Sequence, residues 1–164
     1  MSDPQAENFE DVRAFSLSEA DEAHLLSLQD ECTLTWITRD GSPMSSIVNF
    51  VFHDGCFYVT TASQRPRVAA FRRDPRCTVV VSAKGTSIGV SQTVTYKGTV
   101  DIHDDDETKS WFYPALAARK FPTDMKRAAW YADMLDSPNR VVLRINPTKR
   151  VSYDGRKKQS FEFR

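Results

Sequence analysis

A run of hydroxyl and guanidinium side chains near the middle of the chain has the composition of a phosphate-binding site. The run comprises Thr60, Thr61, Ser63, Arg65 and Arg67. Pro66 suits the first turn of a helix, where its missing N–H costs nothing. A helix start offers free N–H groups and the positive end of a dipole, and guanidinium groups bind phosphate strongly. A solvated basic helix start has the same composition, so the residues alone leave both interpretations open.

Other kinds of chemistry have little support in the sequence. The cysteines and histidines are scattered, without a CxxC pair or metal-ligand spacing: Cys32, Cys56, Cys77, His24, His53 and His103. The cysteines are therefore expected to be small apolar core residues. We expect no metal site, and no Ser-His-Asp or Cys-His arrangement identifies catalytic residues.

The bulk properties indicate one globular domain. The 164 residues are 40% apolar and 27% charged, with a formal net charge of zero. That balance gives no basic excess for nucleic acid, and no apolar run reaches the roughly 18 residues of a membrane span. Residues 1–15 are polar and acidic and lack the pattern of a secretory signal. We expect a soluble cytoplasmic protein with a flexible tail over 1–15 and a single domain over 16–164.

The elements that must position the basic run are mostly strands. Helices are expected over Ser18–Leu28 and Pro66–Arg73, with a helical excursion at about 104–137 that Pro114 should kink or break. Gly98 indicates a bend or a close backbone approach. Strands are expected over Thr33–Thr38, Ser45–Phe52, Cys56–Thr61, Cys77–Ser82, Val90–Ile102, Arg140–Ile145 and Arg150–Tyr153. Asp-Gly turns link the early strands, which favours a closed or nearly closed barrel.

Four segments carry a resemblance to a known family. The central one, Val59–Val80, reads VTTASQRPRVAAFRRDPRCTVV, and the others are Ile47–Tyr58, Thr93–Val100 and Arg140–Val151. In order and spacing they resemble the pyridoxamine 5′-phosphate oxidase-like, FMN-binding split-barrel superfamily. The resemblance implies a mainly β fold: a split β-barrel of about six to seven antiparallel strands with peripheral helices.

The resemblance also implies a homodimer with two cofactor sites at its interface. Thr60 and Thr61 would face the ribityl-phosphate, and Arg67 matches the phosphate-binding lysine of the family. Arg65 would substitute for an arginine that the family places where this chain has Pro66. The ring would be contacted by Ser46, Ile47, Val48, Asn49, Gln92 and Thr93. The chain lacks the C-terminal substrate-binding motif of the oxidase proper.

The function implied is a flavin-dependent oxidoreductase that binds FMN and transfers hydride to or from a small organic substrate. The alternatives are a reductase that uses the deazaflavin coenzyme and a non-catalytic module that holds flavin or haem. FMN is favoured because the acidic cluster 104–107 would repel the carboxylates of the deazaflavin tail if it lay near the groove. Trp111, Phe112 and Tyr113 either form a lid or pack a helix onto the barrel.

Overall fold

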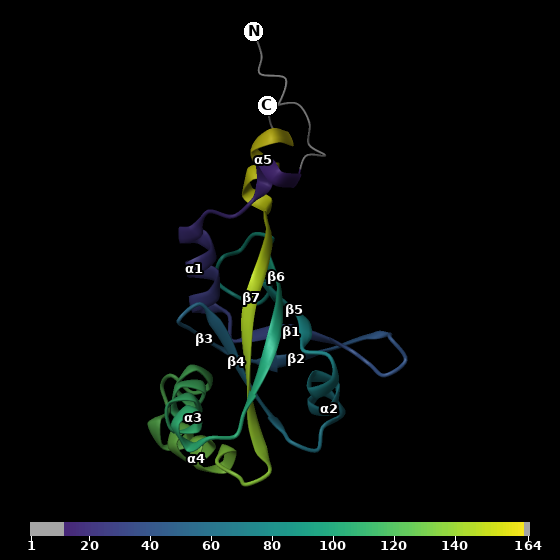
Figure 1. Cartoon of the computed structure of the whole chain (residues 1–164). Helices are drawn as coiled ribbons and strands as arrows, with labels where there is room; N and C mark the ends of the chain where they lie inside the picture. The colour runs from purple at the N-terminus through teal and green to yellow at the C-terminus, as the bar shows by residue number, and fades with distance from the viewer. Residues whose placement is uncertain (1–11, 163–164) are drawn as a thin grey trace.

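Seven antiparallel strands form one strongly curled sheet, with helices around it (Figure 1). The computed structural model describes residues 12–162. The strands are β1 (Glu31–Ile37), β2 (Pro43–Asn49), β3 (Val51–His53), β4 (Cys56–Ala62), β5 (Arg76–Ser82), β6 (Gln92–His103) and β7 (Arg140–Asp154). Their order in the sheet is β2-β1-β5-β6-β7-β4-β3. The mainly β split barrel expected from the sequence is confirmed.

The curl of the sheet follows from its two edges. The edge strands β2 and β3 are consecutive in the chain and separated only by Phe50. The sequence pattern predicts one strand over Ser45–Phe52, but at Phe50 the chain leaves β1 and begins to pair with β4. Because one continuous segment supplies both edges, the sheet bends round on itself and leaves a seam between β2 and β4.

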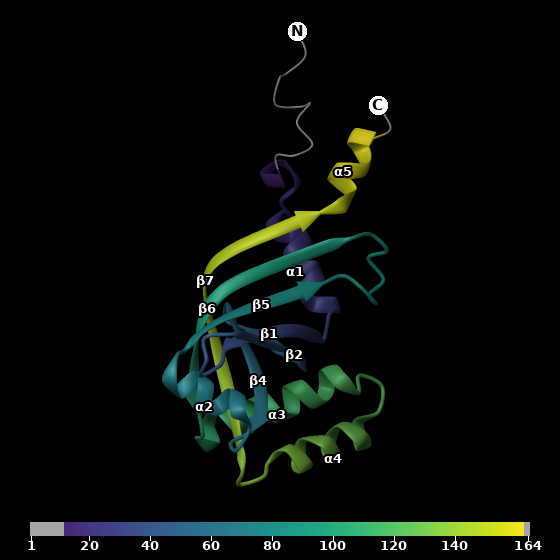
Figure 2. The same ribbon diagram turned by 90° about the vertical axis from the view of Figure 1, so that its right-hand side faces the viewer.

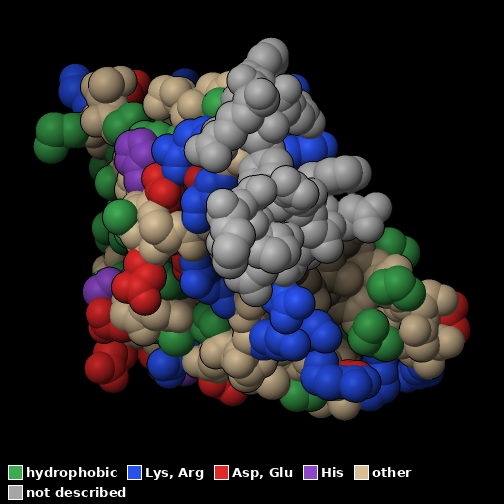
Figure 3. All heavy atoms as spheres, turned by 90° about the horizontal axis from the view of Figure 1, so that it is seen from above, with side chains coloured by type: hydrophobic (Ala, Val, Ile, Leu, Met, Phe, Trp, Pro, Cys, Tyr) green, Lys and Arg blue, Asp and Glu red, His purple; other side chains and the backbone are tan. Residues whose placement is uncertain are grey.

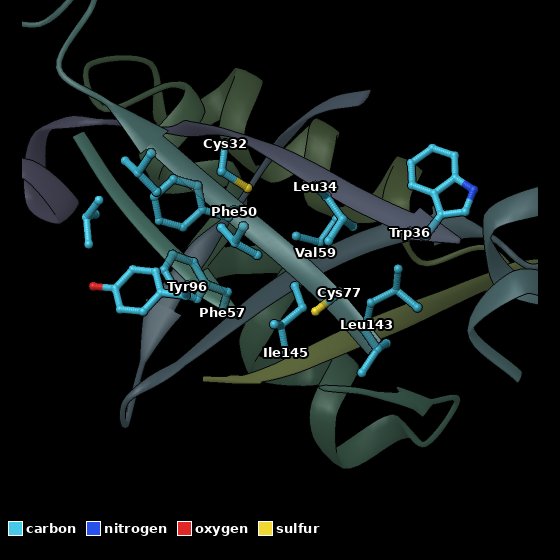
Figure 4. Packing of buried hydrophobic residues seen from close by; sticks show 14 of the residues in the cluster. Cys32, Leu34, Trp36, Phe50, Phe57, Val59, Cys77, Tyr96, Leu143 and Ile145 are labelled. Atoms are coloured by element: carbon cyan, nitrogen blue, oxygen red, sulfur yellow. The ribbon is translucent and has the colours of Figure 1, made fainter. Parts of the chain in front are cut away.

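The inside of the barrel is filled by alternate residues of the strands. The fully buried side chains include Leu34, Phe50, Phe57, Val59 and Leu143, and Figure 4 shows them pointing toward one another from several strands. Period-two alternation sends every second side chain to this interior. Cys32 and Cys77 are buried here, as expected, and burial raises the pKa of both thiols to about 12.

A bulge lets β7 run as one long strand through a proline. The sequence predicts two strands separated by Asn146-Pro147, whereas β7 continues from Arg140 to Asp154. The register shifts at Gly98 on β6, which lies opposite Pro147. A Cβ on Gly98 would lie 2.5 Å from the carbonyl oxygen of Asn146. The close backbone approach expected at this glycine is confirmed, and the bulge accommodates a residue with no N–H to donate.

The helical excursion forms a pair of helices, α3 (Asp106–Lys120) and α4 (Met125–Leu135). Asp105 caps α3 by accepting a 2.7 Å hydrogen bond from the N–H of Thr108. Pro114 does not break α3, which continues through it to Lys120. Pro114 and Ser110, whose carbonyl loses its helical partner, both lie on the exposed side of the helix, where water can replace the missing bond.

Phe112 and Tyr113 pack α3 onto the outside of β4 and β7, together with Tyr58 and Val142. Trp111 lies against His53 and Tyr58. The three aromatic residues therefore attach the helix to the barrel and do not form a lid. In Figure 2, β4 lies between α2 (Pro66–Arg73) on one side and α3 and α4 on the other.

The two ends of the described chain meet at one end of the barrel. The short 3₁₀ helix η1 (Val12–Phe15) lies beside α5 (Gly155–Glu162), and α1 (Glu19–Leu28) packs nearby. Phe15 is buried against Tyr153, so residues 12–15 of the tail predicted over 1–15 are folded, and residues 1–11 lie outside the described residues. A helix at the C-terminal end was not predicted.

Ion pairs join α1 to the end of β7 and to α5, namely Arg150–Glu22 and Arg156–Asp21. Figure 3 looks onto this end and shows Lys and Arg side chains beside acidic ones. No helix within residues 12–162 is long and apolar enough to cross a membrane.

Candidate functional site

A groove opens at the seam between β2 and β4 and brings together segments that are far apart in the sequence. Its volume is about 230 Å³, and it is lined by Val48, Asn49, Thr60, Thr61, Ala62, Arg65, Arg67, Leu116, Tyr131 and Arg140. Strands β2, β4 and β7 supply one part, the start of α2 another, and α3 and α4 the apolar wall. Six of the residues predicted to bind a cofactor therefore lie in one groove.

Arg67 is the best-fixed charge in this groove. Its Nη1 donates a 2.9 Å hydrogen bond to Oγ of Ser46 on β2, and its guanidinium lies 5.3 Å from the ring centre of Trp36. Ser46 therefore contributes to the site indirectly, by accepting this hydrogen bond from Arg67. These contacts span the seam and hold the guanidinium on the side of the groove formed by α2 and β2.

The start of α2 adds further donors. Arg65 is the N-cap residue, its side chain makes no capping hydrogen bond, and Pro66 follows it. Pro66 has no N–H, and the N–H of Val68 donates to the carbonyl of Arg65 at 2.9 Å. The N–H of Arg67 is therefore the group of this first turn that remains open to an acceptor in the groove. Ser63 holds the preceding turn, with its N–H donating to the carbonyl of Asn139 at 2.8 Å.

The charge of the groove is uniformly positive. Arg65, Arg67 and Arg140 line it, and its described lining contains no carboxylate. None of the three forms an ion pair with a described residue. Burial, and then the charge of Arg65, lower the pKa of Arg67. An anion in the groove would relieve this repulsion.

One polar group beside the groove lacks a partner. The Tyr113 side chain is only 2% exposed, and among residues 12–162 its hydroxyl has no hydrogen bond of normal geometry. Burial raises the pKa of Tyr113, against the opposing effects of Thr60, Lys109 and Arg140, and the side chain lines the neighbouring cavity between α3 and α4. Thr60 lines the groove and donates its own proton to the carbonyl of Val141 at 3.2 Å.

Within one chain, three of the residues predicted to bind the cofactor lie outside the groove. Ile47 is 68% exposed and lies outside the lining, which includes the next residue, Val48. Gln92 and Thr93 pair with Asp154 and Tyr153 at the far end of β7, whereas Thr60 pairs with Val142 near its start. Gln92 is buried and donates a 3.2 Å hydrogen bond to Asp154. Gln92 and Thr93 would meet a cofactor in this groove only as residues of a second copy.

Sequence patterns missed the part of the site that comes from distant segments. Arg140 begins a predicted strand, and Leu116 and Tyr131 belong to the predicted helical excursion, but no local pattern assigns them to the groove. Tyr131 is held by Phe121, with ring centres 5.5 Å apart, and by Lys120, whose Nζ is 5.6 Å from its ring centre. Lys120 also donates a 3.0 Å hydrogen bond to Oδ1 of Asn49.

The acidic cluster 104–107 lies outside the groove. Asp104 pairs with Lys109, and Asp105 caps α3. Asp106 and Lys109 line a separate cavity between α3 and α4. The position of this cluster therefore does not disfavour binding of the deazaflavin tail in the groove. Within residues 12–162 no group of His, Cys, Asp and Glu side chains has the geometry to hold a metal.

Comparisons with known proteins agree with this architecture. The sequence model of the pyridoxamine 5′-phosphate oxidase family matches residues 20–153. No curated protein is significantly similar to this chain.

Many solved structures share the fold. A conserved hypothetical protein from Mycobacterium tuberculosis is 23% identical, with a TM-score of 0.78 over 89% of this chain and 90% of that one. A structure described as an F420 reductase is 19% identical, with a TM-score of 0.60 over 78% and 94% of the two chains. A haem storage protein from Vibrio cholerae is 11% identical, with a TM-score of 0.60 over 83% and 93%. At these identities the likeness shows the common fold.

Proposed function

This chain belongs to the pyridoxamine 5′-phosphate oxidase family, and from that premise we propose that it is a flavin-dependent oxidoreductase whose groove binds the ribityl-phosphate of FMN. The observation that carries the proposal is the pair Arg65 and Arg67 at the start of α2, in a groove without a carboxylate in its described lining. A phosphate monoester, which carries a charge of about −1.5 to −2 at pH 7, is the complement of such a site.

The residues present fit a flavin phosphate. Arg67 is already oriented by Ser46, so it loses little freedom when an anion binds. Arg65 and the N–H of Arg67 would donate from a second direction, and the hydroxyl of Thr61 from the floor. Val48 on β2 provides apolar surface for the flat body of the cofactor.

The protein's part in the reaction is to bind and orient. A bound flavin supplies the hydride transfer itself. Arg65 and Arg67 would fix the phosphate end and so set the position of the ring relative to the seam. The apolar wall formed by Leu116 and Tyr131 would exclude water from one side of the bound molecules.

We propose that the protein acts as a homodimer, because the groove of one chain is too small for the whole cofactor. Its volume of about 230 Å³ is below the roughly 300 Å³ at which ligand pockets begin. The exposed outer face of the sheet carries apolar side chains that include Ile47 and Val151, which are 68% and 59% exposed. A second copy on this face would complete the cofactor site and cover the apolar surface.

The deazaflavin coenzyme is the second candidate. It shares the ribityl-phosphate part, so the same arginines would hold it. Lys120 and Arg140 add positive charge that the sequence did not place at this site, and a structural neighbour is described as an F420 reductase. Both observations favour an additional acidic group on the bound ligand.

Side-by-side titrations with FMN, the deazaflavin coenzyme and haem test the proposal. We expect the purified protein to bind FMN at micromolar or lower concentration, with a change in flavin absorbance and fluorescence. Submicromolar deazaflavin binding together with millimolar FMN binding would identify the second candidate. A Soret band with added haem, without binding of either flavin, would contradict both.

A further inference from the structure

Arg140 is the arginine of the groove that the cofactor phosphate does not need. It is the first residue of β7 and pairs with Ala62, the last residue of β4. Directly paired residues of antiparallel strands point to the same face, and both residues line the groove. Arg140 is half-buried and has no ion pair with a carboxylate of the described chain.

The charges in the groove call for more than one anionic group. The phosphate of the proposed cofactor carries a charge of about −1.5 to −2, which Arg65 and Arg67 together neutralise. The guanidinium of Arg140 would then remain without a counterion in a partly desolvated place, which is unfavourable. Arg72 and Arg73 at the other end of α2 are exposed to solvent and face no such cost.

A buried hydroxyl lies behind the groove but does not face it. Tyr113 lines the separate cavity between α3 and α4, together with Lys109 and Asp136, and among the described residues its hydroxyl has no hydrogen bond of normal geometry. Arg140 is therefore the donor that this side of the groove presents to a ligand.

The side of the groove formed by α3 and α4 is apolar and rigid. Leu116 is buried there, and the ring of Tyr131 is fixed by Phe121 and Lys120. A molecule that fills this side of the groove would place an apolar or aromatic body against Leu116 and Tyr131 and an anionic group at Arg140.

We propose that Arg140 forms a second anion-binding subsite, which holds the carboxylate of a small aromatic or aliphatic substrate while Arg65 and Arg67 hold the cofactor phosphate. This inference rests on the proposed function, since it assigns the substrate class of the same site. Arg140 acts in binding and orientation, beside the arginines that hold the phosphate.

The test uses FMN-loaded protein titrated at low ionic strength with benzoate and, separately, with benzamide, its neutral counterpart. Binding is followed by flavin absorbance and by calorimetry. We compare wild type with Arg140→Gln, Arg140→Lys and, as a matched control, Arg72→Gln, which removes an exposed charge outside the groove. A charge-assisted hydrogen bond contributes about 1.5–3 kcal/mol, so benzoate affinity should fall about tenfold to a hundredfold in Arg140→Gln.

Four further results are expected. Arg140→Lys retains part of the benzoate affinity, Arg72→Gln retains all of it, and benzamide binds equally to every variant. FMN affinity stays at the wild-type level in Arg140→Gln. Circular dichroism and the melting temperature verify that each variant is folded.

The proposal is overturned if benzoate does not bind, if it binds no better than benzamide, or if Arg140→Gln binds it like wild type. A loss of FMN affinity in Arg140→Gln as large as that in Arg67→Ala would assign Arg140 to the cofactor and also overturn it. If wild type does not bind FMN at all, the proposed function fails, and the benzoate titrations of the unloaded protein still decide the role of Arg140.

Discussion

Arg67 of α2 donates a hydrogen bond from Nη1 to Oγ of Ser46 on β2, at 2.9 Å. The two residues come from the two segments that border the open seam of the barrel. The contact orients a guanidinium that has no carboxylate partner among the described residues and lies beside the equally unpaired Arg65. The position of Arg67 is therefore set before any ligand arrives.

The affinity for FMN should depend on pH through the ligand more than through the protein. Arginine stays charged at every pH of interest, although burial and Arg65 lower the pKa of Arg67. The phosphate takes up a proton below its second pKa of about 6. Affinity should therefore be constant from pH 7 to 9 and fall toward pH 5, as fluorescence titrations would measure, and it should weaken with added salt. Affinity that increases as the pH falls would contradict phosphate binding by these arginines.

The Tyr113→Phe variant tests whether the buried hydroxyl of Tyr113 contributes to the stability of the fold. Because the hydroxyl has no hydrogen bond of normal geometry, its removal should leave the free energy of unfolding unchanged or raise it by up to about 1 kcal/mol. Phe112→Ala, next to it in the same cluster, should cost about 3–5 kcal/mol. Urea denaturation of the ligand-free variants measures both. A loss above about 1.5 kcal/mol in Tyr113→Phe would mean that the hydroxyl makes a bond within the protein.

Gly98→Ala tests the bulge that allows β7 to pass through Pro147. The new Cβ would meet the carbonyl oxygen of Asn146 at 2.5 Å, and backbone on both sides must move to relieve the clash. We expect a loss of about 1–3 kcal/mol in the free energy of unfolding, the usual cost of overpacking. Lys97→Ala changes the exposed neighbour and serves as control. Equal stability of the two variants would show that β6 and β7 separate here at little cost.

Sequence patterns placed the strands well and the site only in part. Alternation and Asp-Gly turns are local signals, so they located β1, β4 and β5 to within a few residues. They failed at Phe50 and at Pro147, where pairing with distant strands decides whether a strand ends or continues.

The same distinction applies to the groove. Thr60, Thr61, Arg65 and Arg67 are neighbours in the sequence, so one motif predicts them together. Arg140 and Tyr131 reach them only because β7 pairs with β4 and α4 packs beside the barrel. Gln92 and Thr93 were assigned by family resemblance, which describes a dimer and not the geometry of one chain.

The mass in solution tests the proposed homodimer. Static light scattering of micromolar protein should give twice the chain mass of 18.6 kDa. Replacing Ile47, an exposed apolar residue of β2, with Glu should shift the equilibrium toward monomer and weaken FMN binding with it. Ala23→Glu, an exposed change on α1 that adds the same charge away from the sheet, serves as control. A monomeric wild type that still binds FMN tightly would contradict an interface site.

The most direct test of the account is the FMN affinity of Arg67→Ala relative to wild type, with Arg72→Ala as control on the same helix. Removal of Arg67 eliminates a charge-assisted hydrogen bond worth about 1.5–3 kcal/mol. We expect the dissociation constant of Arg67→Ala for FMN to be about tenfold to a hundredfold higher than that of wild type. The FMN affinity of Arg72→Ala should be unchanged, and both variants should have the circular dichroism of wild type. Equal FMN affinity of wild type and Arg67→Ala would contradict the assignment of the cofactor phosphate to this groove.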